Sequence, residues 1–114
     1  MRKQQIENAA YEVATQVRAV EDTIDAALVE IAELQARMMH ASSVAASGYG
    51  TIHPALQQLS AAVAGLVDSR GAIVACHVAL AEAKQKVPGL RTVGWGDVDQ
   101  CPPKTATAPL RVVA

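Results

Sequence analysis

Apolar residues over the first 46 positions recur with a seven-residue spacing. Two interleaved rows carry only apolar side chains, and no Pro or Gly interrupts them. Apolar residues at alternating spacings of three and four are typical of a coiled coil or a helical bundle. The pattern therefore predicts one long helix over about residues 4–46. Its rows are Ile6, Val13, Val20, Ala27, Leu34 and Ala41, and Ala10, Val17, Ile24, Ile31, Met38 and Ala45.

The segment 47–54 predicts a reversal of the chain. Gly48 is a natural left-handed cap for the first helix, and Gly50 follows it. Thr51 or His53 can cap a second helix, with Pro54 in the first turn of that helix. Because a connection this short leaves two helices side by side, we expect an antiparallel helical hairpin.

Residues 53–87 predict the second helix. The apolar strip through which it would pack, its seam, changes from apolar to partly polar along the helix. One row stays apolar, whereas its companion row begins with two apolar residues and then becomes Arg70, His77 and Lys84. Val67, Val74 and Val78 offer apolar surface on an adjoining side, so the seam is predicted to turn near residues 65–71 and to face a second neighbour. The stripe of Arg70, His77 and Lys84 either pairs with acids of the first helix or forms a solvent-facing edge. The apolar row is Ile52, Leu59, Leu66, Ile73, Leu80 and Val87.

The second helix must stop at Pro88 and Gly89, which divides the chain into a hairpin (residues 1–87) and a C-terminal arm (residues 88–114). The arm lacks a helical period and contains Pro102, Pro103 and Pro109, so an extended conformation is expected. A single Trp on such a segment usually anchors it to an apolar surface. The residues predicted to dock on a partner are Trp95, Leu110, Val112 and Val113.

The composition indicates that an isolated hairpin would be only marginally stable. The chain of 114 residues suits a single domain, but it has no Phe, one Trp and two Tyr. Small aliphatic side chains bury little area each, so a two-helix monomer gains little from its core. We therefore expect an all-α fold in which antiparallel hairpins form a bundle by homo-oligomerisation. The residues predicted to mediate self-association are Val13, Val20, Ile24, Ile31, Leu34, Leu59, Leu66, Ile73 and Leu80.

The charge and the targeting signals limit the classes of partner and the cellular location that the sequence predicts. The formal net charge of −1 disfavours nucleic acid, which requires clustered Lys and Arg. Residues 7–37 hold seven acids and two arginines, a local net charge of −5, which is either a solvated face or a docking surface for a basic partner. The N-terminus lacks the apolar segment of a signal peptide, and Asp68 and Arg70 divide the best membrane-span candidate. With only Cys76 and Cys101, the chain is predicted to be reduced, cytoplasmic and not inserted in a membrane.

No motif for chemistry stands out. Cys76 and His77 are adjacent, so they point about 100° apart on a helix, and neither has a metal-ligating residue three or four positions away. Nucleophile-elbow, phosphate-loop and calcium-loop patterns are absent from the sequence. We therefore predict no enzyme activity, no metal and no cofactor.

These features favour a non-enzymatic structural or assembly protein that self-associates through helical seams and docks its arm on a neighbouring subunit. A virion-like or other multi-subunit particle, assembled in the cytoplasm, would suit it. The alternative is a cytosolic adaptor or regulator that binds a partner protein through its acidic first helix and tail. A third interpretation is a ligand-binding bundle or accessory enzyme subunit with His77 and Cys76 near a pocket.

Overall fold

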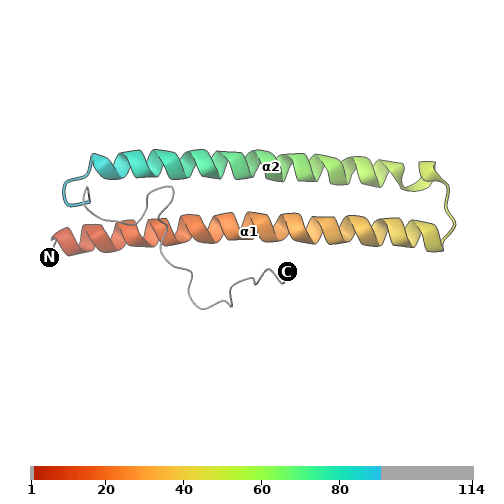
Figure 1. The fold of residues 1–114 in the computed structure, drawn as a ribbon, viewed down its shortest axis with the longest axis horizontal. Helices are drawn as coiled ribbons and strands as arrows, with labels where there is room; N and C mark the ends of the chain where they lie inside the picture. The colour runs from red at the N-terminus through yellow and green to blue at the C-terminus, as the bar shows by residue number, and fades with distance from the viewer. Residues whose placement is uncertain (1, 91–114) are drawn as a thin grey trace, which may run out of the picture.

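A computed structural model describes residues 2–90, which form two long helices lying side by side in opposite directions (Figure 1). Helix α1 spans Arg2–Val44 and helix α2 spans Tyr49–Gln85. No strand occurs in the described part of the chain. The longest dimension of 67 Å matches the roughly 65 Å expected for a helix of this length. The predicted all-α antiparallel hairpin is confirmed.

The first helix ends in a Schellman motif, and its left-handed residue is not the predicted Gly48. Ala46 has a φ of 52°, and its N–H donates to the Ser43 carbonyl oxygen at 3.1 Å. The Ser47 N–H donates to the Ser42 carbonyl oxygen at 3.2 Å, the longer bond of the motif. The Ser47 hydroxyl also lies 3.3 Å from that oxygen. These bonds satisfy the last carbonyl groups of α1, so the chain turns two residues earlier than predicted.

Helix α2 accordingly begins earlier than its sequence signals suggest. Gly48 is its N-cap, with extended backbone angles and no side-chain capping bond. The predicted caps Thr51 and His53 lie inside the helix, and Pro54 lies beyond its first turn. Because Pro54 has no N–H, the helical hydrogen bond that would reach the carbonyl oxygen of Gly50 is missing at this position.

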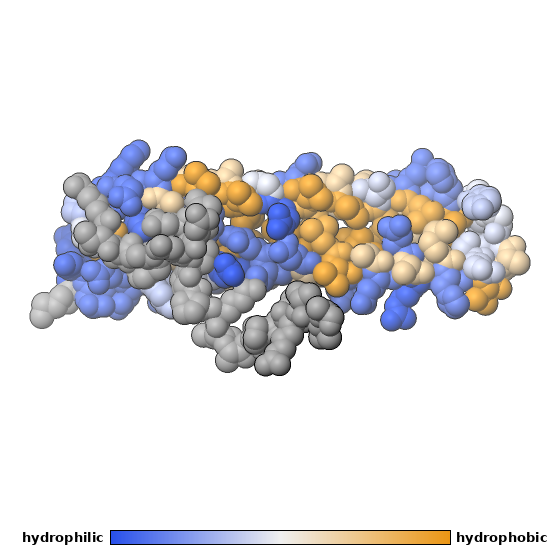
Figure 2. All heavy atoms as spheres, viewed as in Figure 1, coloured by the Kyte–Doolittle hydropathy of each residue, from blue (hydrophilic) through white to orange (hydrophobic). Residues whose placement is uncertain are grey.

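The seam between the helices is long and thin. Ile24 on α1 and Ile73 on α2 are half-buried and line one shallow hollow, while Val17 and Leu80 line another nearer the chain ends. Among the apolar residues of the described range, only Leu59 and Leu90 are buried. Figure 2 shows apolar residues spread over the visible surface of both helices rather than confined between them. Two helices thus shield one strip of each other and leave the remaining apolar surface to solvent.

The polar row of α2 remains at the contact with α1 in the second half of the helix. His77 and Lys84 are each only 7% exposed, whereas the Arg70 side chain is about half exposed at the edge of the contact. The carboxylates of α1 opposite Arg70 and His77 let these polar side chains stay there. Val67, Val74 and Val78 are exposed in the hairpin, so their predicted contact with a second neighbour stays a prediction.

A short turn closes the end of α2. The helix stops at Gln85, and Gly89 adopts a φ of 91° within the turn that follows. This turn returns Leu90 to the seam, where it is 5% exposed. The predicted docking residues of the arm, Trp95, Leu110, Val112 and Val113, lie outside the described residues.

Helix α2 is long and apolar enough, by length and composition, to cross a membrane, and little of that apolar stretch is buried in the hairpin. The same test is passed by core helices of soluble proteins. The absence of membrane insertion therefore stays a prediction.

The Schellman motif yields a stability prediction. Replacing Ala46 with Gly removes the contact between Cβ and backbone that disfavours a positive φ, and this outweighs the greater freedom of Gly in the unfolded chain. We expect Ala46→Gly to raise the free energy of unfolding by about 0.5–1 kcal/mol, measured by urea denaturation followed by circular dichroism at fixed protein concentration.

The neighbouring substitution Ala45→Gly is the control, because Ala45 has no positive φ. It should leave stability unchanged or lower it. Equal effects of the two substitutions would contradict the assigned cap.

Candidate functional site

The two sides of the hairpin differ in chemistry, and helical geometry assigns each residue to a side. Residues one or four positions after a seam residue lie on one side of a helix, and residues three positions after it lie on the other. Asp25 follows Ile24 by one position and Glu21 follows Val17 by four. On α2 the row of Arg70, His77 and Lys84 follows the seam by four positions. These residues form the charged flank, namely Glu21, Asp25, Arg70, His77 and Lys84.

An exposed ion pair joins the helices on the charged flank. The Arg70 Nε donates to Asp25 Oδ1 at 2.8 Å, and both side chains are about half exposed. The hydrogen bond to Asp25 and the negative charge of its carboxylate raise the pKa of Arg70. Since solvent screens an exposed pair, this contact fixes register more than it stabilises the fold.

A second contact on this flank is more buried. The Nδ1 of His77 lies 3.0 Å from Oε1 of Glu21, with exposed side-chain fractions of 9% and 29%. A buried imidazole that lost this partner would leave a polar atom unsatisfied, which typically costs about 1–3 kcal/mol. The two contacts decide between the alternatives left open by the sequence: Arg70 and His77 of the polar stripe pair with α1.

The remaining polar groups of this flank are packed along the same edge. Lys84 is buried, and its aliphatic stem can cover apolar surface. Arg18 follows Val17 by one position, and its Nε is buried without a hydrogen-bond partner within residues 2–90. Glu21, Asp25, Arg70 and His77 are therefore engaged in contacts within the hairpin, while Asp25 and Arg70 remain about half exposed.

The rows three positions after the seam form the opposite edge, the uncharged flank, and carry no ionisable group other than the thiol of Cys76. Its α1 residues follow the seam by three positions and include Val13 and Leu34, each 48% exposed. Its α2 residues are all small and exposed. On this flank α1 thus carries bulky aliphatic side chains, and α2 carries a row of small residues beside them. The flank comprises Val13, Val20, Ala27, Leu34 and Ala41 on α1, and Ala55, Ala62, Ser69, Cys76 and Ala83 on α2.

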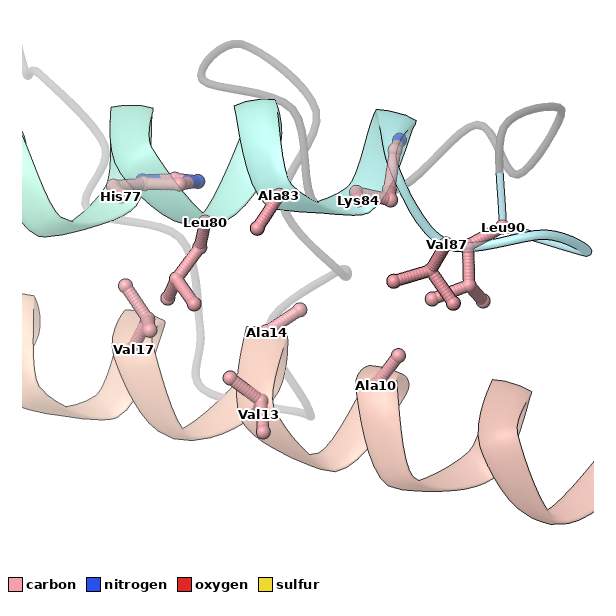
Figure 3. Close-up of a pocket in the computed structure, with 10 residues that line it drawn as sticks. All are labelled: Ala10, Val13, Ala14, Val17, His77, Leu80, Ala83, Lys84, Val87 and Leu90. Atoms are coloured by element: carbon pink, nitrogen blue, oxygen red, sulfur yellow. The ribbon is translucent and has the colours of Figure 1, made fainter.

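A hollow of about 200 Å³ opens between the helices near the chain ends (Figure 3). His77 lines it and Cys76 does not. In Figure 3 the Lys84 amine points away from α1, so the inner walls are aliphatic. The hollow can accept apolar atoms but presents no converging polar groups. Its lining is Ala10, Val13, Ala14, Val17, His77, Leu80, Ala83, Lys84, Val87 and Leu90.

Metal-ligating and nucleophilic side chains do not gather in the described range. No three His, Cys, Asp or Glu side chains of residues 2–90 are placed to hold a metal ion. Cys76 is free and exposed. The Nδ1 of His77 faces the Glu21 carboxylate rather than a hydroxyl or thiol.

The predicted self-association residues separate into two groups. Ile24, Ile31, Leu66 and Ile73 are half-buried and Leu59 is buried, so these five serve the contact within the hairpin. Val13, Leu34 and Leu80 remain exposed, and Val20 is half-buried on the uncharged flank. The heptad pattern of the sequence does not indicate Leu90 as a seam residue. The preceding Pro88 and Gly89 signalled a turn, but nothing in the local pattern indicated that it returns to the seam.

Comparison of the chain with protein-family models, with curated proteins and with solved structures finds no match. The function must therefore be inferred from the two flanks and the open hollow.

The Glu21–His77 contact predicts a measurable coupling. In a double-mutant cycle of Glu21→Ala and His77→Ala, we expect an interaction free energy of about 1 kcal/mol at neutral pH, because the imidazole is buried and its partner is half-buried. Urea denaturation of the four proteins at one concentration gives this value.

The Asp25–Arg70 pair provides the comparison. Its coupling should be smaller and should vanish in high salt, because both groups are exposed. A larger coupling for the exposed pair than for Glu21–His77 would contradict this assignment.

Proposed function

We propose that this protein is a non-enzymatic structural subunit that self-associates through its helices to build a larger assembly. One observation carries the proposal: in residues 2–90 the hairpin leaves twelve large hydrophobic side chains exposed and buries only two apolar residues. Exposed apolar surface on this scale is typical of proteins that bind other proteins.

The energetics favour association. Complete burial of a Val, Leu or Ile side chain is worth about 1.5–3 kcal/mol, and the half-exposed seam of this hairpin realises only part of that. Packing hairpins against each other would bury the apolar surface that a single hairpin leaves exposed, without any further helix or strand. Bundles of four helices gain their stability in this way, with apolar rows from each helix meeting at a common core.

The shape of the hairpin supports a structural role over a catalytic one. Two helices about 60 Å long present extended surfaces, and the hollow between them has aliphatic walls without converging polar groups. Extended complementary surfaces suit repeated contacts between subunits, as in a virion-like or other multi-subunit particle.

The mass of the protein in solution tests the proposal. We expect size-exclusion chromatography with light scattering to give a multiple of the 11.9 kDa chain mass for the full chain, with a concentration-dependent fraction of free chains. The driving force is the burial of apolar surface that one hairpin leaves exposed. A monomer at all concentrations up to about 100 µM, well above a micromolar dissociation constant, would overturn self-association.

Flotation with phosphatidylcholine vesicles separates self-association from the membrane alternative raised by α2. The assembly is expected to stay at the bottom of the gradient, in the fractions that contain no vesicles. Quantitative recovery with the vesicles, together with loss of the oligomer, would mean that lipid rather than another chain covers the apolar surface.

A further inference from the structure

We propose that the uncharged flank is the surface on which a second copy of this chain docks, with α1 of each copy packed against α2 of the other. This inference rests on the proposed self-association and names the surface that performs it. The two flanks of the hairpin are competing candidates, and three features of the structure favour the uncharged one.

The first feature is charge. Covering the charged flank would remove water from Asp25 and Arg70, both now about half exposed, and that desolvation is costly. The ten residues of the uncharged flank carry no formal charge, and Glu30 and Arg37 lie at its outer rim on α1, six positions after the seam residues Ile24 and Ile31. A second hairpin can cover the ten residues while the ends of these two long side chains stay in water at the rim.

The second feature is shape. On α1 the flank is a ridge with Val and Leu side chains, whereas on α2 it is a row of Ala, Ser and Cys. Alternation of large and small residues across facing positions lets helices pack closely. One hairpin cannot use this complementarity, since both rows point to the same side of it. A two-fold axis parallel to the helices places the ridge of each copy over the small row of the other, and two-fold dimers are the commonest protein assembly.

The third feature is register. The contacts of Glu21 with His77 and of Asp25 with Arg70 fix the register of the two helices, in which Val20 and Cys76 lie at nearly the same height on the uncharged flank. Both rows repeat every seven residues, so this correspondence continues along the flank. A two-fold axis parallel to the helices preserves height, so Val20 of one copy faces Cys76 of the other, and Leu34 faces Ala62.

The size of the flank is sufficient for a stable dimer. From Val13 to Ala41 it extends about 40 Å, and it spans two helices of about 10 Å each. This gives about 800 Å² per copy, the amount that each partner contributes to a standard stable interface.

Disulfide trapping tests the register. In a Cys101→Ser background, Val20→Cys should give a covalent dimer on mild oxidation, seen on a non-reducing denaturing gel. Mass spectrometry should identify a disulfide that joins the introduced thiol at position 20 of one chain to Cys76 of the other. The matched control is Val29→Cys in the same background, because Val29 is 60% exposed and lies on the outer face of α1.

The cross-link decides between the possible outcomes. If light scattering shows an oligomer but position 20 cross-links no better than position 29, or only within one chain, the docking surface is wrong while self-association stands. If the unmodified chain is a monomer, both proposals fail. A Cys76–Cys76 linkage as the main product would place α2 against α2 and would also overturn this arrangement.

A pair of substitutions tests the choice of flank without cross-linking. Leu34 and Val74 are 48% and 47% exposed, but Val74 lies beside Glu21 and Asp25 on the charged side. Leu34→Lys should raise the dimer dissociation constant by roughly 100-fold or more, whereas Val74→Lys should change it little. Circular dichroism checks that both variants stay helical. The reverse order of effects would assign the interface to the charged flank.

Discussion

The controlling constraint on this molecule is that two helices touch along a single strip. A helix buries about one stripe of its surface against one neighbour, and side chains as small as Ala and Val do not reach around it. The consequence is visible at Val13 and Leu34, which belong to a regular apolar row yet remain about half exposed. Stability of the isolated hairpin is therefore limited by geometry rather than by a shortage of apolar residues.

The polar row of α2 is a consequence of the same constraint. In a thick core, Arg70, His77 and Lys84 would be costly, but in a strip one residue deep their ends can reach acids or solvent at the edge. Glu21 and Asp25 lie at this edge, so part of the acidic surface of α1 is engaged in contacts with α2. These contacts also set the register, since an apolar seam of similar residues could slip by a heptad at little cost.

The sequence predicted the class of fold well because a heptad pattern depends only on the helix period. It was less informative where the outcome depends on contacts between helices. The turn was misplaced because Ala46 adopts a conformation that usually belongs to Gly, held there by hydrogen bonds to Ser42 and Ser43. The sequence left open whether the polar row of α2 pairs with α1 or faces solvent. The position of Glu21 opposite His77, which is set by the antiparallel register, decides in favour of pairing there.

The asymmetry of the two flanks could have been found in the sequence by placing each residue relative to the seam. That step requires knowing which row is the seam. On α1 either apolar row could be the seam until the position of α2 is known. The polar contacts between the helices resolve the ambiguity, since Glu21 and Asp25 mark one side and leave Val13, Val20 and Leu34 on the other. The charged groups that pair across the helices lie at one edge, and the rows three positions after the seam at the opposite edge are uncharged. A second hairpin can therefore pack on that opposite edge at a lower desolvation cost than on the charged one.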